Sequence, residues 1–388
     1  MNRRNFFKLT GTYTGGMLLL PDFLHAFAHQ EQLKPGDNSL VFIQLFGGND
    51  GLNTYIPYTD ELYYKYRPNI AIAKDKVIGA YKDMAFHPAL KGLANIQQEG
   101  NLSVIQNVGY PEPDRSHFRS REIWETASDS DKYLTNGWLG RFLDLNCNGH
   151  QPLAGLNVDD IDSLSLKGLE PNSITTRESN YKSGGNKTYS LSGNPELDFV
   201  RRIANSASEG ASTLSSILNK TPETAAVDYP KSELAKNLKW MARLIKGGLN
   251  SKVYYTSLNG FDTHEHQLGV HNSKLAIMGD AVYAFYSDLK KSGLLNQVTI
   301  VIFSEFGRRV QDNGGGTDHG TAAPMFVIGG NNKGNLIGKN PDLVNLDKGD
   351  LIYDIDFRSV YASLLKDKFA FDPKKIGIAN NPLRGLFS

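Results

Sequence analysis

Four short segments, far apart in the sequence, carry acids, histidines or a serine where strands are expected to end. They are residues 47–51, 115–117, 260–266 and 304–320. Ligands that come from separate segments and meet at the strand ends of one sheet are typical of α/β enzymes. The pattern therefore favours a metal-assisted hydrolase over a passive binding module.

The densest of these segments is 260–266, which places Asp262, His264 and His266 within five positions. Carboxylates and imidazoles are common ligands of divalent metals. His264 and His266 would share a face in an extended chain, whereas Asp262 and His266 would pair in a helical turn. Surface histidines also occur by chance, but this run at a strand end favours a metal or catalytic role.

Asp50 directly follows the predicted strand 39–46, with Gly47 and Gly48 between them. The glycines permit a sharp turn and leave room for a ligand. A carboxylate in this place suits a metal. The alternative is an Asx turn with no role in chemistry.

Glu305 ends a later predicted strand, and Asp318 and His319 follow a glycine run at 314–316. All three are candidate metal ligands. Glu305 would otherwise pair with a neighbouring arginine, and Asp318 would otherwise orient His319. The glycines allow a mobile or tightly turned loop over the site.

Ser116 starts the predicted helix 116–127. A serine there is most often an N-cap. The same position suits a nucleophile, because a helix N-terminus stabilises negative charge on an attacked phosphate or sulfate. Arg115, Arg119 and Arg121 add cations that could hold an oxyanion.

Predicted strands alternate with predicted helices along most of the chain. This order indicates an α/β fold, a doubly wound and mainly parallel sheet with helices on both faces. The polar segment 149–230, rich in Ser, Asn, Thr and Gly, is predicted to be an insertion or cap with a helix near 196–217. The predicted strands are 39–46, 101–108, 252–258, 297–304 and 324–328, and the predicted helices are 88–98, 116–127, 231–249, 273–291 and 356–366.

The amino-acid composition and net charge limit the classes of function that we expect. The chain of 388 residues carries 42 basic and 41 acidic residues, a formal net charge of +1. A general nucleic-acid binder is unexpected with so little net charge. The single cysteine, Cys147, excludes an internal disulfide and a cysteine-rich zinc site.

Residues 1–28 have the features of a twin-arginine export signal. Arg3 and Arg4 precede a weakly apolar, glycine-interrupted stretch, and 26–28 (Ala-Phe-Ala) offers small residues for signal peptidase. The alternative is a membrane anchor. A helix that spans a bilayer needs ~20 consecutive apolar residues, and this apolar stretch is shorter and is interrupted by glycines. We therefore expect a periplasmic or extracellular protein, residues 29–388, without a transmembrane anchor after cleavage.

Several motifs together resemble one bacterial family, filed as domain of unknown function 1501 (DUF1501). They are GGNDGLN, FHPAL, YPEPDRSHFRS, WETA, GWLGR, GFDTHEHQ and SEFGRRVQDNGGGTDHGTAAPMFVIGG. The resemblance covers nearly the whole chain after the signal. The family is grouped with the alkaline phosphatase-like superfamily of phosphatases, sulfatases and phosphomutases. It implies a doubly wound α/β fold with two metal sites around a Ser, Thr or formylglycine nucleophile.

The resemblance also implies roles for individual residues. Asp50 resembles the first-strand ligand of the second metal. Asp262 and His266 resemble the Asp-x-x-x-His pair of the first metal, which His319 would complete. Ser116 lies where the nucleophile should be.

One departure concerns Glu305. Superfamily members carry an Asp-His pair there, but this chain has Glu305-Phe306. His117 or His264 could replace the missing histidine, or Asp318-His319 could itself be the pair. The chain therefore could hold one metal rather than two.

A formylglycine sulfatase is disfavoured by sequence. Such enzymes need Cys or Ser in a Cys/Ser-x-Pro-x-Arg context, and neither Cys147 nor Ser116 has it.

The sequence predicts an exported metal-dependent hydrolase of phosphate or sulfate esters. Ser116 would be the nucleophile, with Arg115 and His117 beside it. The cofactor would be one or two divalent ions. Zinc is the preferred candidate, and magnesium, manganese and calcium are the alternatives. The partner would be a small-molecule or polymer ester, not nucleic acid. The alternatives are an exported metal- or ligand-binding protein that keeps the fold without turnover, and a structural partner of other exported proteins.

Overall fold

A nine-stranded sheet forms the centre of the computed structural model, which describes residues 38–147, 150–181 and 188–387. Its strands are β1 (Ser39–Phe46), β5 (Leu102–Gly109), β6 (Gly155–Asn157), β7 (Ser173–Thr175), β8 (Val253–Asn259), β9 (Val298–Ser304), β10 (Ala323–Gly329), β11 (Leu336–Ile337) and β14 (Ile355–Asp356). The strand order is β11-β5-β10-β9-β1-β8-β6-β7, and β14 pairs with β5.

The sheet is mainly parallel. Strand β1 pairs in parallel with both β8 and β9, and among the described strands of this sheet only β10 runs antiparallel to its neighbours, β5 and β9. All five predicted strands are present, and 39–46 has the predicted bounds.

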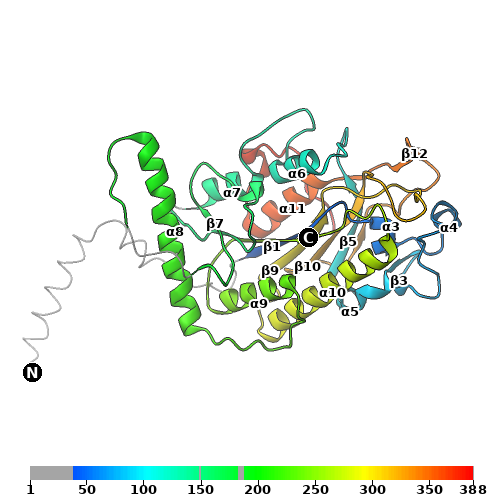
Figure 1. The fold of residues 1–388 in the computed structure, drawn as a ribbon, viewed down its shortest axis with the longest axis horizontal. Coiled ribbons are helices and arrows are strands. Elements are labelled where there is room, and N and C mark those ends of the chain that lie inside the picture. The colour runs from blue at the N-terminus through cyan, green and yellow to red at the C-terminus, as the bar shows by residue number, and fades with distance from the viewer. Residues whose placement is uncertain (1–37, 148–149, 182–187, 388) are drawn as a thin grey trace, which may run out of the picture.

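Helices cover both faces of the sheet (Figure 1). The helices of one face are α5 (Lys91–Gln98), α9 (Glu233–Lys246) and α10 (Gln267–Lys291), and those of the other are α6 (His117–Thr126), α7 (Trp138–Asn146) and α11 (Phe357–Phe369). Alternate residues of a strand point to opposite faces. Val41 and Ile43 of β1 accordingly lie in the core of the first face, and Leu40 and Phe42 in that of the second. The predicted doubly wound α/β fold is confirmed.

The polar segment predicted as an insertion contributes to the main sheet. Strands β6 and β7 extend it beyond β8. Helix α8 (Pro195–Lys220) then projects from the body of the molecule (Figure 1). The Asn194 side chain caps this helix by accepting from the backbone amides of Glu196 and Leu197, and Leu214 and Leu218 anchor its C-terminal half in the core.

Short elements surround the sheet. A three-stranded sheet in the order β2-β4-β3 lies apart from the main one. The short elements are α3 (Gly51–Thr54), β2 (Tyr55–Ile56), α4 (Glu61–Tyr66), β3 (Ile78–Tyr81), β4 (Met84–Phe86), η2 (Pro88–Leu90), η3 (Leu164–Leu166), β12 (Leu346–Asp347), β13 (Asp350–Leu351) and η5 (Pro373–Ile376).

Helix α10 begins at Gln267, six residues before its predicted start. His266 precedes it in the left-handed region, with φ of 52°, and the backbone amide of Gln267 donates to the carbonyl of Gly315. The segment 260–266 is therefore a loop that ends in a reversal at His266, rather than an extended continuation of β8.

The predicted export signal, residues 1–28, lies outside the described residues. Within the described part of the chain, none of the helices combines the length and the apolar character that crossing a membrane requires.

Candidate metal centre

The four chemistry-bearing segments meet at one edge of the sheet. In the parallel register of β1 with its neighbours, Phe46 lies opposite Asn259 and Leu45 opposite Ser304. The loops that follow these three strands therefore leave the same edge. Strand β5 also ends there, because its Val108 lies opposite Ala323, the first residue of antiparallel β10.

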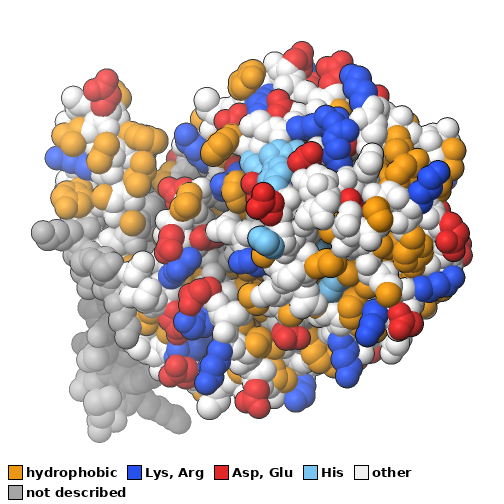
Figure 2. Space-filling view, turned by 45° about the vertical axis from the view of Figure 1, so that its right-hand side comes forward, with side chains coloured by type: hydrophobic (Ala, Val, Ile, Leu, Met, Phe, Trp, Pro, Cys, Tyr) orange, Lys and Arg blue, Asp and Glu red, His pale blue; other side chains and the backbone are white. Residues whose placement is uncertain are grey.

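Asp262 is at the centre of a histidine cluster. Its Oδ1 atom lies 3.4 Å from Nε2 of His117, 2.9 Å from Nε2 of His264 and 3.2 Å from Nε2 of His319. The Nε2 atoms of His264 and His319 are 3.1 Å apart. Figure 2 shows histidine side chains gathered beside acidic and basic ones on one face. Two loops and one helix thus direct four ligand-type side chains to one place.

The other ring nitrogen of each histidine contacts an oxygen atom. Nδ1 of His117 lies 2.8 Å from Oε1 of Glu305, and Nδ1 of His264 lies 3.1 Å from Oδ1 of Asp318. Nδ1 of His319 lies 2.7 Å from the carbonyl oxygen of Arg115. A carbonyl only accepts, so His319 carries its proton on Nδ1, and the carboxylates favour the same tautomer in the other two rings.

This tautomer leaves three Nε2 lone pairs facing one carboxylate oxygen. Nε2 of His117 is buried and has no aligned hydrogen-bond partner among the described residues. The ligand atoms of His117, Asp262 and His319 all lie within 4.8 Å of one another. Imidazole ligands whose second nitrogen is held by a carboxylate or carbonyl are characteristic of metal sites. Three nitrogens and one oxygen suit zinc, so the residues present fit a divalent cation.

Arg308 fixes Asp262. Its fully buried guanidinium donates from Nη2 to Oδ1 of Asp262 at 2.6 Å, and from Nη1 to the carbonyl of Thr317 at 2.8 Å. Its Nε donates to the carbonyl of Gly48 at 2.7 Å. Burial alone would raise the pKa of Asp262, but Arg308 outweighs it and holds that pKa well below its usual range. Asp262 is therefore ionised at neutral pH.

Glu305 is completely buried and orients His117. Its Oε1 accepts from the backbone amides of Gly47 at 2.8 Å and Gly48 at 3.1 Å. Burial would lower the pKa of His117, but the hydrogen bond and the charge of Glu305, together with Asp262, raise it above its usual value. Glu305 was expected to be a metal ligand, and the structure places it behind a ligand-type histidine instead.

A glycine-closed hairpin brings Asp318 and His319 to the cluster. Arg308 and His319 form an isolated antiparallel bridge, and the amide of Arg309 donates to the carbonyl of Asp318 at 3.0 Å. A Cβ atom on Gly320 would lie 2.5 Å from the carbonyl carbon of Arg308. Only glycine permits so close a pairing, which folds this loop back over the end of β9.

Asp50 does not join the cluster. It is fully buried, and its Oδ2 accepts from Arg67 at 2.6 Å in an ion pair with no exposed side-chain surface. The same oxygen accepts a short hydrogen bond from the Gln267 amide, and Oδ1 accepts from the amide of Asn53. Burial would raise the pKa of Asp50, but Arg67 lowers it. The Arg67 guanidinium thus supplies the positive charge that balances the buried Asp50 carboxylate.

His266 and Ser116 are exposed. No hydrogen bond or ion pair of the His266 side chain is found within the described ranges, and its backbone reversal directs the chain into α10. Ser116 occupies the N-cap position of α6, but its hydroxyl caps no backbone amide there. The Arg115 side chain pairs with the buried carboxylate of Asp350.

Two supporting residues were not identified as such from the sequence. Arg308 is one of the arginines near Glu305 in the sequence, but its side chain binds Asp262. Gln267 links the buried Asp50 to the site loops, because its Oε1 accepts from the hydroxyls of Thr263 and Thr317. Their contacts join segments that are distant in sequence, so no local pattern marks them.

We compared the sequence with protein families and curated proteins, and the fold with solved structures. The comparisons identify one family and several distantly similar structures. No curated protein matches the sequence. A phosphonate monoester hydrolase, SpPMH from Silicibacter pomeroyi, is 11% identical with a TM-score of 0.41, over 90% of this chain and 76% of that one. A protein in the alkaline phosphatase superfamily from Vibrio parahaemolyticus is 11% identical with a TM-score of 0.40, over 87% and 67%. The periplasmic domain of EcEptC from Escherichia coli, in complex with zinc, is 12% identical with a TM-score of 0.38, over 77% and 74%.

The family comparison extends over more than half of the chain. Residues 104–350 match the family described as "Protein of unknown function (DUF1501)". This range includes the candidate ligands His117, Asp262, His264 and His319, together with Glu305. The family resemblance is thus confirmed over residues 104–350, and the chain belongs to the DUF1501 family.

Proposed function

We propose that the protein is a metal-dependent hydrolase of phosphate or sulfate esters. His117, Asp262 and His319 would hold one divalent cation, with His264 as a further ligand. The observation that carries this proposal is the convergence of three imidazole Nε2 atoms on one ionised carboxylate, with each Nδ1 held by an oxygen acceptor. Zinc is the first choice for such a donor set.

A bound cation would act as a Lewis acid that neutralises charge on the oxygens of the ester. Residues around the cluster hold the candidate ligands in the charge state and orientation that a cation requires. Arg308 keeps Asp262 ionised, and Glu305, Asp318 and the Arg115 carbonyl keep the three imidazoles oriented. This arrangement avoids reorganisation when substrate binds.

Ser116 is the proposed nucleophile. It precedes His117 directly and lies exposed at the N-terminus of the ten-residue helix α6, where the helix dipole favours an anionic substrate. Because its hydroxyl makes no capping bond, it is available for attack. In the reaction, the Ser116 hydroxyl would lose its proton as Oγ bonds to phosphorus or sulfur, and the bond from that atom to the alcohol oxygen would break, with the electron pair and a proton going to the departing alcohol. Water would then attack the same phosphorus or sulfur, release phosphate or sulfate and restore the Ser116 hydroxyl.

We also propose that the protein is exported by the twin-arginine pathway, from the features of residues 1–28. Fractionation of cells that express the full chain tests this. Retention in the cytoplasm of a variant with Arg3 and Arg4 changed to Lys is the expected result, and unchanged export would contradict the pathway.

The hydrolase proposal is tested on purified full-length protein by metal analysis and by assays on aryl phosphates and aryl sulfates with zinc, magnesium or manganese. We expect the wild type to bind metal and hydrolyse one ester class. Asp262→Asn should lose both properties, whereas Ser116→Ala should lose hydrolysis and keep metal. Glu265→Gln, a change of an exposed acid beside the cluster, is the matched control. Full activity of both Asp262→Asn and Ser116→Ala would refute the proposal.

A second candidate is a metal-binding protein without turnover. It is favoured by the Arg67–Asp50 ion pair, because a carboxylate already paired with a buried guanidinium is not available to bind a second cation. Stoichiometric metal, lost in Asp262→Asn, with no hydrolysis across the ester panel would support this candidate over the first.

A further inference from the structure

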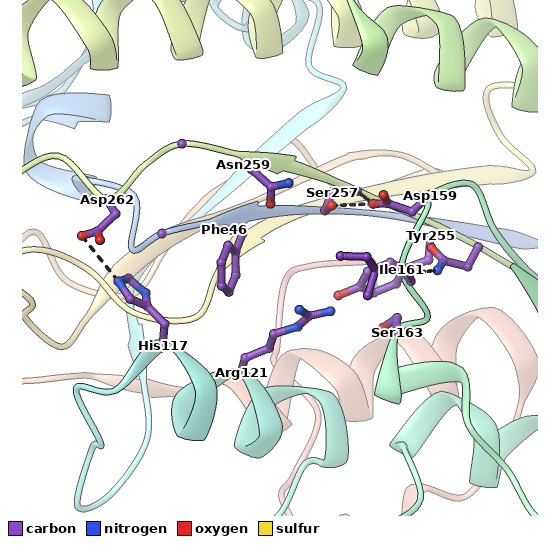
Figure 3. Close-up of a pocket in the computed structure, with 13 residues that line it drawn as sticks. Phe46, His117, Arg121, Asp159, Ile161, Ser163, Tyr255, Ser257, Asn259 and Asp262 are labelled. Carbon is purple, nitrogen blue, oxygen red and sulfur yellow. Dashed lines mark hydrogen bonds and ion pairs between the residues drawn. The ribbon is translucent and has the colours of Figure 1, made fainter. Parts of the chain in front are cut away.

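A cavity of about 340 Å³ adjoins the histidine cluster around Asp262 (Figure 3). His117 and Asp262 line one end of it, and the rest is formed by α6, the end of β1, strand β8 and the loop after β6. Its volume is at the lower end of the range for small-molecule sites. A substrate held at the cluster would therefore extend its non-reacting part into this cavity.

Arg121 supplies hydrogen-bond donors to the cavity. Its side chain points inward from α6, between Phe46 and Ser163 (Figure 3). Its Nε donates to the buried carboxylate of Glu125 at 3.2 Å, and its guanidinium carbon lies 5.5 Å from the centre of the Phe46 ring. No partner of Nη1 or Nη2 is found among the described residues, so both are free to bind a ligand.

Asn157 supplies an acceptor that lacks a partner. The residue is 1% exposed, and its Oδ1 atom is buried without a hydrogen bond in the described part of the chain. Its amide nitrogen donates to the carbonyl of Ile161 at 2.8 Å, which fixes the orientation of the side chain. A buried carbonyl oxygen without a partner is unfavourable, but solvent does not reach this atom, so Asn157 adds polarity to the cavity wall rather than a direct ligand contact.

Asn259 and Asp159 add further polar groups. Asn259 is exposed at the end of β8, and its amide is able to donate and to accept. Asp159 is held in place by the backbone amide and hydroxyl of Ser257. Phe46, Ile161 and Tyr255 contribute apolar surface. The cavity thus presents donors, acceptors and ring faces together.

This combination selects a class of ligand. Each hydroxyl group both donates and accepts, whereas a purely apolar group would leave Asn259 and Arg121 unsatisfied. A purely anionic group would meet the Asp159 carboxylate. We infer that the cavity binds a hydroxylated ring, so that the alcohol part of the ester is a sugar unit. The link to ester cleavage depends on the proposed function, but binding of the sugar itself does not.

The direct test is sugar binding to metal-free, full-length protein. Isothermal titration or ligand-observed NMR would use glucose, galactose, mannose and their 6-phosphates, with cyclohexanol as the apolar ring of similar size. We expect saturable binding of at least one sugar and none of cyclohexanol. Asn259→Ala and Arg121→Lys should each weaken that binding about tenfold, the effect of losing roughly one hydrogen bond.

Asn272→Ala, the same change at an exposed position of α10 that does not line the cavity, is the matched control and should bind as the wild type does. Thermal unfolding of each variant separates lost binding from lost folding. If no sugar binds while aryl esters are hydrolysed, the sugar inference is wrong and the hydrolase proposal stands. If a sugar binds and no ester is cleaved, the cavity inference stands and the hydrolase proposal fails. Equal affinities of Asn259→Ala, Arg121→Lys and wild type would also overturn the inference.

Discussion

Glu305 acts on the candidate metal centre through His117, because its carboxylate contacts Nδ1 of that ring and no other ligand-type side chain of the cluster in the described structure. It raises the pKa of His117, so a proton must leave this ring before a cation binds. Metal affinity should therefore rise with pH through the raised pKa of His117.

The variant Glu305→Gln tests this coupling. Without the carboxylate charge, the pKa of His117 falls, so the pH at which metal affinity is half lost should also fall. Affinity at high pH should drop by about 10–100-fold, as for other residues that orient metal ligands. Zinc titrations with a competing chelator between about pH 6 and about pH 9 measure both effects. If zinc affinity depended on pH with the same midpoint in Glu305→Gln as in the wild type and in the control Glu265→Gln, the coupling would be contradicted.

Arg67 is important for stability because Asp50 is buried with it. Replacing Arg67 by Met leaves an uncompensated carboxylate in the interior, which costs about 3–5 kcal/mol of unfolding free energy. Urea denaturation measures this loss. Lys65→Ala, at an exposed neighbouring cation, should stay within about 0.5 kcal/mol of the wild type. Adding Asp50→Asn to Arg67→Met should recover part of the loss, and the absence of any recovery would argue against the ion pair as its cause.

Two buried histidines make the fold sensitive to acid. Burial lowers the pKa of His271 to about 3 and that of His87 to about 4, from an ordinary value of 6.5. The unfolded chain therefore binds more protons between these values, and their contribution to stability, complete above pH 6.5, is lost as the pH falls. The melting temperature should decrease over this range. His271→Gln, which can still donate to Oδ1 of Asn49, should show a shallower decrease.

At the scale of elements, the glycine-closed hairpin 307–320 determines whether His319 reaches Asp262. Gly316 packs against the loop after β8, where an added Cβ would lie 2.6 Å from the carbonyl carbon of His264. Gly316→Ala should destabilise the protein by about 1–3 kcal/mol and weaken metal binding, because the hairpin must move away. Calorimetry and zinc titration measure the two effects. At Gly315, where the nearest such contact is 3.9 Å away, the same substitution should change neither.

The long apolar elements were predictable from sequence, and the short ones were not. The run 39–46 contains buried β-branched and aromatic residues throughout, so its pattern alone indicates a strand. Strands β6 and β7 have three residues each and lie in a polar segment, where the pairing of β6 with β8 and of β7 with β6, rather than composition, makes them strands. The start of α10 was missed because a long-range bond from Gln267 to Gly315 decides it.

The same distinction applies to the candidate site. Parallel strand ends share an edge, so the sequence predicted which loops would meet. It did not predict which atoms would face each other, because the hydrogen-bond partners of His117 and His319 lie 188 and 204 residues away in the chain. The separation of Asp50 from the cluster likewise depends on the buried Arg67 guanidinium, and no local sequence motif predicts that contact.

At the scale of the whole molecule, metal binding should stabilise the fold. The ligands come from α6 and from the loops after β8 and β9, so a cation would join segments that separate on unfolding. A free metal concentration of about 100 Kd adds about 2.7 kcal/mol to the free energy of unfolding. Zinc should raise the melting temperature and EDTA should reverse the rise. His319→Ala should abolish the response, and a persistent response would place the metal elsewhere.

The main-chain carbonyl of Arg115 orients His319, and this has a consequence for genetics. Glu305 and Asp318 orient the other two rings through side chains, so a single codon change can remove either contact. No codon change at position 115 removes a backbone oxygen. In a saturation mutagenesis screen for metal retention, position 115 should tolerate more residues than position 305, although each substitution at 115 also removes the ion pair with Asp350. The contact between His319 and the Arg115 carbonyl therefore cannot be detected by comparing residue types at position 115.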